Sequence, residues 1–162
     1  MTVRAETIPD TSRLDAWVRF LRAHAALTRE LSAELVAEHG LTLNDYEVLL
    51  HLARAPERRM RRVDLAESVL LTASGITRLL EGLERSGFVE RVLCDSDRRV
   101  AYAKLTEVGL EKLRQASRTH MAGIEELFVG RFTGDERATL STLLSRLPAA
   151  GDETLECTSD PG

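Results

Sequence analysis

One cluster in the sequence combines small hydroxyl side chains with a glycine and an arginine. Its members are Thr72, Ser74, Gly75, Thr77 and Arg78. Hydroxyl and guanidinium groups donate hydrogen bonds to phosphate oxygens and to base edges, and a glycine lets another molecule approach the backbone closely. The alternative is that the hydroxyls cap and solvate a helix and that Arg78 is an ordinary surface residue. Which of these two interpretations holds depends on the secondary-structure element that contains the cluster.

A second cluster, Asp95-Ser96-Asp97-Arg98-Arg99, places two guanidinium groups beside two carboxylates. Carboxylates repel a polyanion, but an aspartate can also hold an arginine in one rotamer, which removes part of the roughly 2 kcal/mol of side-chain entropy lost on binding. An arginine fixed in this way suits the narrow, strongly negative minor groove of A·T-rich DNA. A soluble turn whose charges neutralise one another explains the same residues equally well. On the first interpretation Asp97, Arg98 and Arg99 are candidates for DNA contact.

Other chemistries have little support in the sequence. Cys94 and Cys157 are far apart and lack any Cys-x-x-Cys or Cys/His spacing, so we expect inert thiols and neither a disulfide framework nor a zinc site. Redox activity of either thiol stays open. The histidines lack a His-Glu-x-x-His spacing, and no Ser/His/Asp set, acid pair or phosphate-binding loop is visible. We therefore expect no enzyme activity, no metal site and no cofactor.

The charge distribution favours an anionic partner at the middle of the chain. The 162 residues carry 22 basic and 26 acidic side chains, a net charge of −4. Residues 54–104, however, hold 11 basic against 8 acidic side chains. A basic centre between acidic ends indicates one anionic partner that docks at the centre. No apolar run approaches the ~18 residues of a membrane span and residues 1–8 lack a signal-peptide core, so we expect a cytoplasmic protein with no membrane partner.

Hydrophobic periodicity and helix-capping residues predict a mainly helical (α+β) chain with one β-hairpin. Helices are expected over residues 14–39, 42–55, 63–69, 72–86, 106–128 and 133–147, strands over 88–93 and 100–105, and a charged loop over 57–62. Gly40 and Gly87 are expected to end helices, and Pro148 to end the last one. Two short helices at a tight turn followed by a hairpin have the order of a winged helix-turn-helix DNA-binding domain. The first cluster then begins the helix that fits the major groove, and the second forms the tip of the wing.

The helices at both chain ends carry more apolar residues than a winged domain of roughly fifty residues can cover. These residues are Leu14, Trp17, Leu21, Phe128, Phe132, Leu140, Leu143, Leu144 and Leu147. They predict a helical dimerisation region built from both ends of the chain, although core packing within one chain is the alternative for any single residue. A two-fold homodimer presents two recognition helices about 34 Å apart and binds an inverted repeat in double-stranded DNA.

Several motifs in this order resemble the MarR family of winged helix-turn-helix regulators. They are Val63-Asp64-Leu65-Ala66, residues 72–83, Gly87-Phe88-Val89-Glu90-Arg91, Asp95-Ser96-Asp97-Arg98-Arg99 and Leu105-Thr106-Glu107-Val108-Gly109. The resemblance covers residues 14–147 and implies that the recognition helix starts at Thr72. It also implies that Arg99 enters the minor groove and that Asp97 orients it. Peroxide sensors of the family have a cysteine near the start of the first long helix, and this chain has none there.

The resemblance further implies a small, often aromatic, effector bound where the dimer helices meet the winged domain. Candidate ligand-binding residues are Trp17, His24, Tyr46 and His51, which combine flat surfaces with polar tips. Ordinary core aromatic and histidine residues are the alternative.

The sequence thus predicts four regions. Residues 12–55 are expected to hold dimerisation and packing helices, 56–105 the DNA-binding domain, 106–148 further dimerisation helices and 149–162 a disordered acidic tail. The function expected is a transcriptional repressor or activator, a homodimer that binds a pseudo-palindromic operator and is released by a small-molecule effector. The alternative is a winged-helix protein-interaction module that does not bind DNA.

Overall fold

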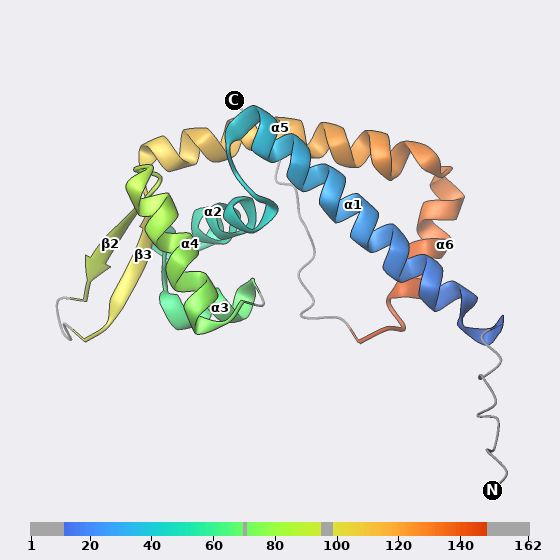
Figure 1. Ribbon diagram of the computed structural model, residues 1–162, viewed down its shortest axis with the longest axis horizontal. Helices are drawn as coiled ribbons and strands as arrows, with labels where there is room; N and C mark the ends of the chain where they lie inside the picture. Colours follow the sequence, from blue (N-terminus) through green and yellow to red (C-terminus); the bar gives the residue numbers. More distant parts are fainter. Residues whose placement is uncertain (1–11, 70, 95–98, 149–162) are drawn as a thin grey trace, which may run out of the picture.

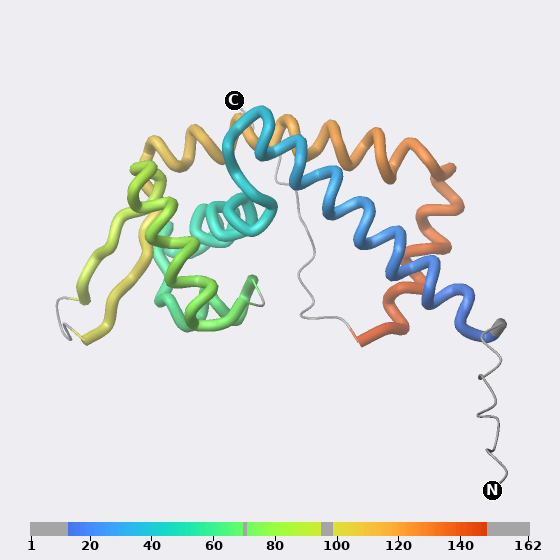
Figure 2. The backbone as a smooth tube through the Cα atoms, in the orientation of Figure 1, coloured from blue at the N-terminus to red at the C-terminus, as the bar shows by residue number. Residues whose placement is uncertain are grey.

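Two long helices cross in the upper part of an arch-shaped molecule and connect its two ends (Figure 1). They are α1 (Asp15–His39) and α5 (Glu107–Leu127), and they pack against each other. The computed structural model describes residues 12–69, 71–94 and 99–148. The backbone trace follows α5 from the winged part of the molecule at the left to the chain's last helix at the right (Figure 2).

The winged part contains the predicted helices and hairpin: α2 (Leu43–Arg54), α3 (Arg62–Ser68), α4 (Ala73–Arg85), β2 (Val89–Leu93) and β3 (Ala101–Leu105). The mainly α, winged helix-turn-helix fold class is confirmed. Local signals set the boundaries. Gly40 and Gly87 take positive φ angles of 68° and 75° after α1 and α4. The Thr42 and Asp45 side chains form a capping box at the start of α2.

The predicted charged loop over residues 57–62 is partly wrong, because it contains a third strand. After the 3-10 turn η2 (Pro56–Arg58), β1 (Arg59–Arg61) pairs antiparallel with β3, from Arg59 opposite Lys104 to Arg61 opposite Tyr102. The sheet order is β1-β3-β2, so β3 is hydrogen-bonded on both sides. The residues Arg-Met-Arg have no strand preference of their own, and the partner strand supplies the hydrogen bonds that keep them extended.

One hydrophobic core joins the winged part to the ends of the long helices. Leu35 of α1, Leu49 and Leu52 of α2, Leu65 of α3 and Leu80 of α4 are fully buried in it. The same cluster includes Val89, Ala103 and Leu105 from the sheet and Leu113 and Ala116 of α5. The core therefore crosses the predicted boundaries at residues 55 and 105, and the four-region division remains a proposal about function rather than packing.

The two chain ends form the other part of the arch. After η3 (Val129–Arg131), α6 (Gly134–Leu144) begins with a capping box formed by Thr133 and Glu136 and buries none of its residues. The helix ends at Leu144, so Pro148 does not end it and Leu147 lies beyond it, contrary to the prediction. The described part of the chain begins with η1 (Ser12–Leu14), and the first half of α1 is exposed. Within the described ranges, no helix has both the length and the apolar character needed to cross a bilayer.

Candidate functional site

The first turn of α4 is fixed by a side-chain cap. Thr72 Oγ1 accepts a hydrogen bond from the backbone N–H of Gly75 at 3.1 Å, and it lies 3.2 Å from Ser74 Oγ. Thr72 and Ser74 are both exposed. The remaining free N–H groups of this turn and the helix dipole favour an anion at this end of α4.

Two members of the predicted cluster have structural tasks inside the helix. A Cβ atom at Gly75 would lie 3.1 Å from Thr72 Oγ1, so glycine leaves room for the cap. Thr77 is half-buried, and its Oγ1 donates to the carbonyl oxygen of Ala73 at 2.8 Å. The hydroxyl of Thr77 is therefore already hydrogen-bonded. Without DNA, the hydroxyls of Thr72 and Thr77 serve the helix itself, as the alternative interpretation of this cluster expects.

Arg78 lies on the exposed face of α4, opposite the buried side chains of Ile76, Leu80 and Leu83. Arg78 forms no ion pair or hydrogen bond with any residue that the structure describes. Its guanidinium group is thus available to an external acceptor. Two further exposed residues share this face, Glu81 and Arg85. Neither was predicted as a site residue, although their spacing from Arg78 of three and seven residues indicates the same helix face.

The hairpin lies beside α4, and β2 packs against it. The first turn of α4 and the open ends of β2 and β3 lie at the same end of the winged part (Figure 1). Arg99 is exposed just before β3. Asp97 and Arg98 lie outside the described residues, so the predicted pairing of Asp97 with Arg99 stays a prediction.

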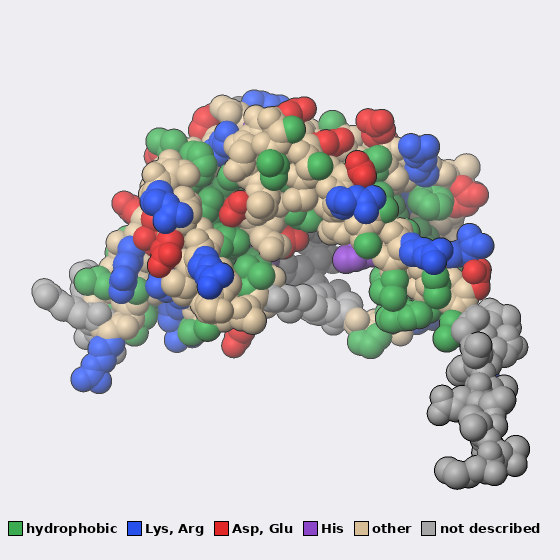
Figure 3. Space-filling model, viewed as in Figure 1, with side chains coloured by type: hydrophobic (Ala, Val, Ile, Leu, Met, Phe, Trp, Pro, Cys, Tyr) green, Lys and Arg blue, Asp and Glu red, His purple; other side chains and the backbone are tan. Residues whose placement is uncertain are grey.

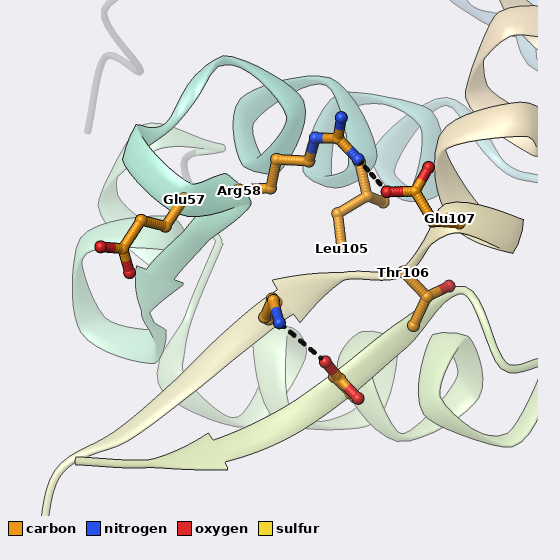
Figure 4. Close-up of a pocket in the computed structure, with 7 residues that line it drawn as sticks. Glu57, Arg58, Leu105, Thr106 and Glu107 are labelled. Carbon is orange, nitrogen blue, oxygen red and sulfur yellow. Dashed lines mark hydrogen bonds and ion pairs between the residues drawn. The ribbon is translucent and has the colours of Figure 1, made fainter. Parts of the chain in front are cut away.

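The basic side chains at the base of the wing differ from Arg78 because they are paired within the chain. Arg58 contacts Glu107 at 2.6 Å and Lys104 contacts Glu90 at 3.3 Å, and all four residues line one open hollow (Figure 4). Arg61 makes a two-pronged contact with Asp64 at 2.7 and 2.8 Å. These cations are partly neutralised already, so the surface of α4 is the better anion site.

The four predicted effector residues fall into two groups within one chain. Trp17 and His24 lie on the exposed first half of α1, and both have ring centroids within 6.5 Å of that of Phe20. Tyr46 is buried in α2 and His51 is half-buried one turn later. One chain by itself therefore does not bring the four residues into a single pocket.

The structure reveals a different neighbourhood for Tyr46. Its ring centroid lies 4.6 Å from that of His120, and its hydroxyl lies 3.2 Å from Ser117 Oγ. His120 and Ser117 are on α5, so these contacts join α2 to the helix that leads out of the winged part. No spacing in the sequence indicates that His120 meets Tyr46, because the two residues are 74 positions apart and on different helices.

Two short helices, the second with an exposed polar face, followed by a β-hairpin that packs beside it, define a winged helix-turn-helix protein. The family sequence model described as MarR family matches residues 39–100. An uncharacterized HTH-type transcriptional regulator of Bacillus subtilis, YkoM, is 31% identical over 128 residues, which are 78% of this chain and 80% of YkoM. The chain belongs to the MarR family of transcriptional regulators, a class of regulators and not of enzymes.

Solved structures agree with this assignment. The chain is similar to AbsC, a MarR family transcriptional regulator from Streptomyces coelicolor, with 33% identity, a TM-score of 0.76 and coverage of 86% of this chain and 93% of AbsC. It is also similar to Sco3205, a MarR family regulator from the same organism solved in complex with DNA, with 27% identity, a TM-score of 0.77 and coverage of 90% of each chain.

Proposed function

We propose that this regulator is a homodimer that binds an inverted-repeat, pseudo-palindromic operator through α4 and the wing and leaves it when a small effector binds. The observation that carries the DNA contact is the exposed face of α4, where the hydroxyls of Thr72 and Ser74 lie in the capped first turn and Arg78 has no partner among the described residues. Sco3205, which has the same fold, was solved with DNA bound.

Apolar side chains at the chain ends support the homodimer. Leu14, Trp17, Val18, Phe20 and Leu21 of the first turns and Leu143, Leu144 and Leu147 near α6 are all at least one-third exposed. Figure 3 shows apolar side chains gathered at the right of the view, over α6 and the start of α1. An apolar surface of this kind on a single chain favours burial against a second copy. Residues 12–55 and 106–148 would then serve the dimer, and residues 56–105 the DNA; 149–162 lie outside the described residues.

In the proposed complex the first turns of α4 lie in the major groove. Thr72, Ser74 and Arg78 contact bases and phosphates there, while Gly75 and Thr77 shape the turn. Arg99 reaches the adjacent minor groove from the wing, oriented by Asp97 and assisted by Arg98.

A mobility-shift assay with double-stranded DNA flanking the protein's own gene tests this proposal. Arg78→Ala and Arg99→Ala should each weaken binding by about 1–3 kcal/mol, and each should reduce the slope of affinity against salt by about one ion. Arg78→Ala should also relax base preference. Arg114→Ala is the control, because Arg114 is exposed on α5 and its guanidinium lies 3.8 Å from Glu111. Equal DNA affinity of the wild type and the three variants would contradict the proposed interface.

Asp97→Ala separates an orienting aspartate from a merely charged turn. Removing a negative charge should tighten binding if only electrostatics matters. If Asp97 orients Arg99, binding should weaken instead, because the freed guanidinium must be ordered at the groove. Affinities measured at several salt concentrations distinguish the two, and tighter binding throughout would remove Asp97 from the site.

The proposed effector site combines residues from two parts of the molecule. Tyr46 and His51 lie where the long helices join the winged part, and Trp17 and His24 lie on the proposed dimer surface, so a second chain is needed to bring the two groups together. A small aromatic acid that releases DNA must bind the free protein more tightly than the DNA complex, by the same factor by which it weakens DNA binding. Titration of both forms with a panel of such acids checks this reciprocity.

The competing function is a winged-helix module that binds a protein and no DNA. The guanidinium of Arg78, which has no partner among the described residues, favours DNA binding over this alternative, because it offers an anionic partner a donor that no carboxylate of the described chain occupies. Absence of any shift with a broad set of duplexes at low salt would support the alternative.

A further inference from the structure

A straight row of four exposed side chains runs along α4 on the face opposite its buried residues. The row consists of Ser74, Arg78, Glu81 and Arg85. Steps of four, three and four residues keep all four on one side of a helix. Glu81 therefore lies on the same face as Arg78, about one turn further along the helix.

Glu81 lies between two arginines and pairs with neither. In the part of the chain that the structure describes, none of Glu81, Arg78 and Arg85 takes part in an ion pair or a side-chain hydrogen bond. The guanidinium of Arg85 lies 4.0 Å from the position that a Cβ at Gly82 would take, so it leans along the glycine side of the helix.

Three other carboxylates near α4 are paired with basic side chains. Glu84, one turn after Glu81, lies 3.8 Å from the guanidinium of Arg62, and Glu90 and Asp64 are paired as described above. Among the described residues nothing pairs with the carboxylate of Glu81, which lies on the face that the proposed function turns towards DNA.

A carboxylate on that face limits which groups of the DNA can lie against it. It cannot lie against phosphate, because like charges repel, and a carboxylate that loses its water without a donor is costly. In the major groove the hydrogen-bond donors are the amino groups at cytosine N4 and adenine N6. A carboxylate can accept a hydrogen bond from cytosine N4. Adenine has an acceptor, N7, beside its amino group and therefore suits an amide side chain better.

We propose, on the basis of the proposed function, that Glu81 is a specificity-determining residue that accepts a hydrogen bond from a cytosine amino group. It fixes a C·G pair at one position in each operator half-site. Arg78 and Arg85, on either side, bind guanine or phosphate and offset the charge of Glu81.

Selection from a randomised duplex library with the full-length protein tests this inference. The wild type should select cytosine at one position of each half-site, and Glu81→Gln should select adenine there, because a glutamine side chain matches adenine N6 and N7. On the wild-type sequence Glu81→Gln should bind about tenfold more weakly. Glu84→Gln removes the same charge from the same helix and is the control; it should select the same bases as the wild type.

The opposite outcome is as clear. If Glu81→Gln selects the wild-type sequence and binds all duplexes more tightly by one common factor, then Glu81 only repels DNA and the inference is overturned while the proposed function stands. If the wild type selects no sequence, both fail. Matching thermal unfolding curves for the three proteins would show that the change lies in the contact and not in the fold.

Discussion

The ring of His120 packs against that of Tyr46, and its Nδ1 is buried with no hydrogen-bond partner in the described structure. Burial lowers the pKa of the imidazole from its ordinary value of 6.5, because the charged form loses water without gaining a partner. His120 is therefore neutral in the folded chain over a range in which it is partly charged in the unfolded chain.

This shift predicts that stability falls in mild acid. A group whose pKa is lowered by folding contributes stability above its unfolded pKa and loses it as the pH falls through the folded pKa. The free energy of unfolding should be lower at about pH 5.5 than at about pH 7.5, and His120→Phe should make this difference smaller. Urea unfolding at both pH values and at one protein concentration measures it.

The titration of Glu47 also changes stability with pH, so the wild type must be compared with His120→Phe. Burial raises the pKa of its carboxyl, with a smaller opposing effect from His51, so its contribution to stability falls as the pH rises. This effect opposes that of His120 in the wild type but is common to His120→Phe, so it cancels in the comparison. An identical pH dependence for the two proteins would show that His120 does not titrate in this way.

At the scale of elements, the joint between the wing and α5 depends on Gly109. Thr106 Oγ1 accepts from the N–H of Gly109 at 3.0 Å and donates to the carbonyl oxygen of Gly87 at 2.7 Å, so the start of α5 is tied to the end of α4. A Cβ at position 109 would fall on the carbonyl oxygen of Phe88 and 2.8 Å from its carbon. The neighbouring group is backbone, which has little freedom to move.

Gly109→Ala should therefore destabilise the protein by at least about 2–3 kcal/mol, because the helix must move off the sheet edge. Gly82→Ala is the matched control. Gly82 is also inside a helix, but a Cβ there would meet only the guanidinium of Arg85, at 4.0 Å. It should stabilise the protein by about 0.5–1 kcal/mol through the unfolded state. Similar denaturation midpoints for the two variants would contradict the packing of this joint.

At the scale of the whole molecule, the exposed chain ends determine assembly. Trp17 is 56% exposed and Leu144 is 37% exposed, and neither belongs to the core cluster. An aspartate in their place should weaken the proposed dimer without unfolding the winged part, because it leaves a charge on a surface that must lose water.

We expect Trp17→Asp and Leu144→Asp each to raise the dimer dissociation constant by at least about a hundredfold, as two buried charges per dimer imply. Light scattering over a range of concentrations measures this, and circular dichroism checks that the fold is kept. Thr142→Asp, an exposed position on the same helix, is the control and should leave the dimer unchanged. A stable dimer of both Trp17→Asp and Leu144→Asp would mean that the chains meet elsewhere.

Most helices and both hairpin strands follow from the sequence alone, because their signals are local. The caps at Thr42, Thr72, Thr106 and Thr133 each bond to a backbone group three residues away, and Gly40 and Gly87 supply the positive φ angles that follow a helix. The position of Arg78 on an open helix face also follows from periodicity. Hydrogen-bonding groups that pair within one helical turn are close in the sequence, so the sequence alone predicts their pairing.

Contacts between segments that are far apart in the sequence were decided only by the tertiary structure. Strand β1 exists because β3 lies opposite it, and its own three residues give no strand signal. Trp17 and His24 are separated from Tyr46, and His120 is brought to it, by the way in which α1 and α5 cross the winged part. Arg78 differs from Arg58 because folding brings Arg58 to the carboxylate of Glu107, 49 residues away in the sequence. Charge type is a property of the residue, but whether a charge is neutralised depends on what folding places beside it.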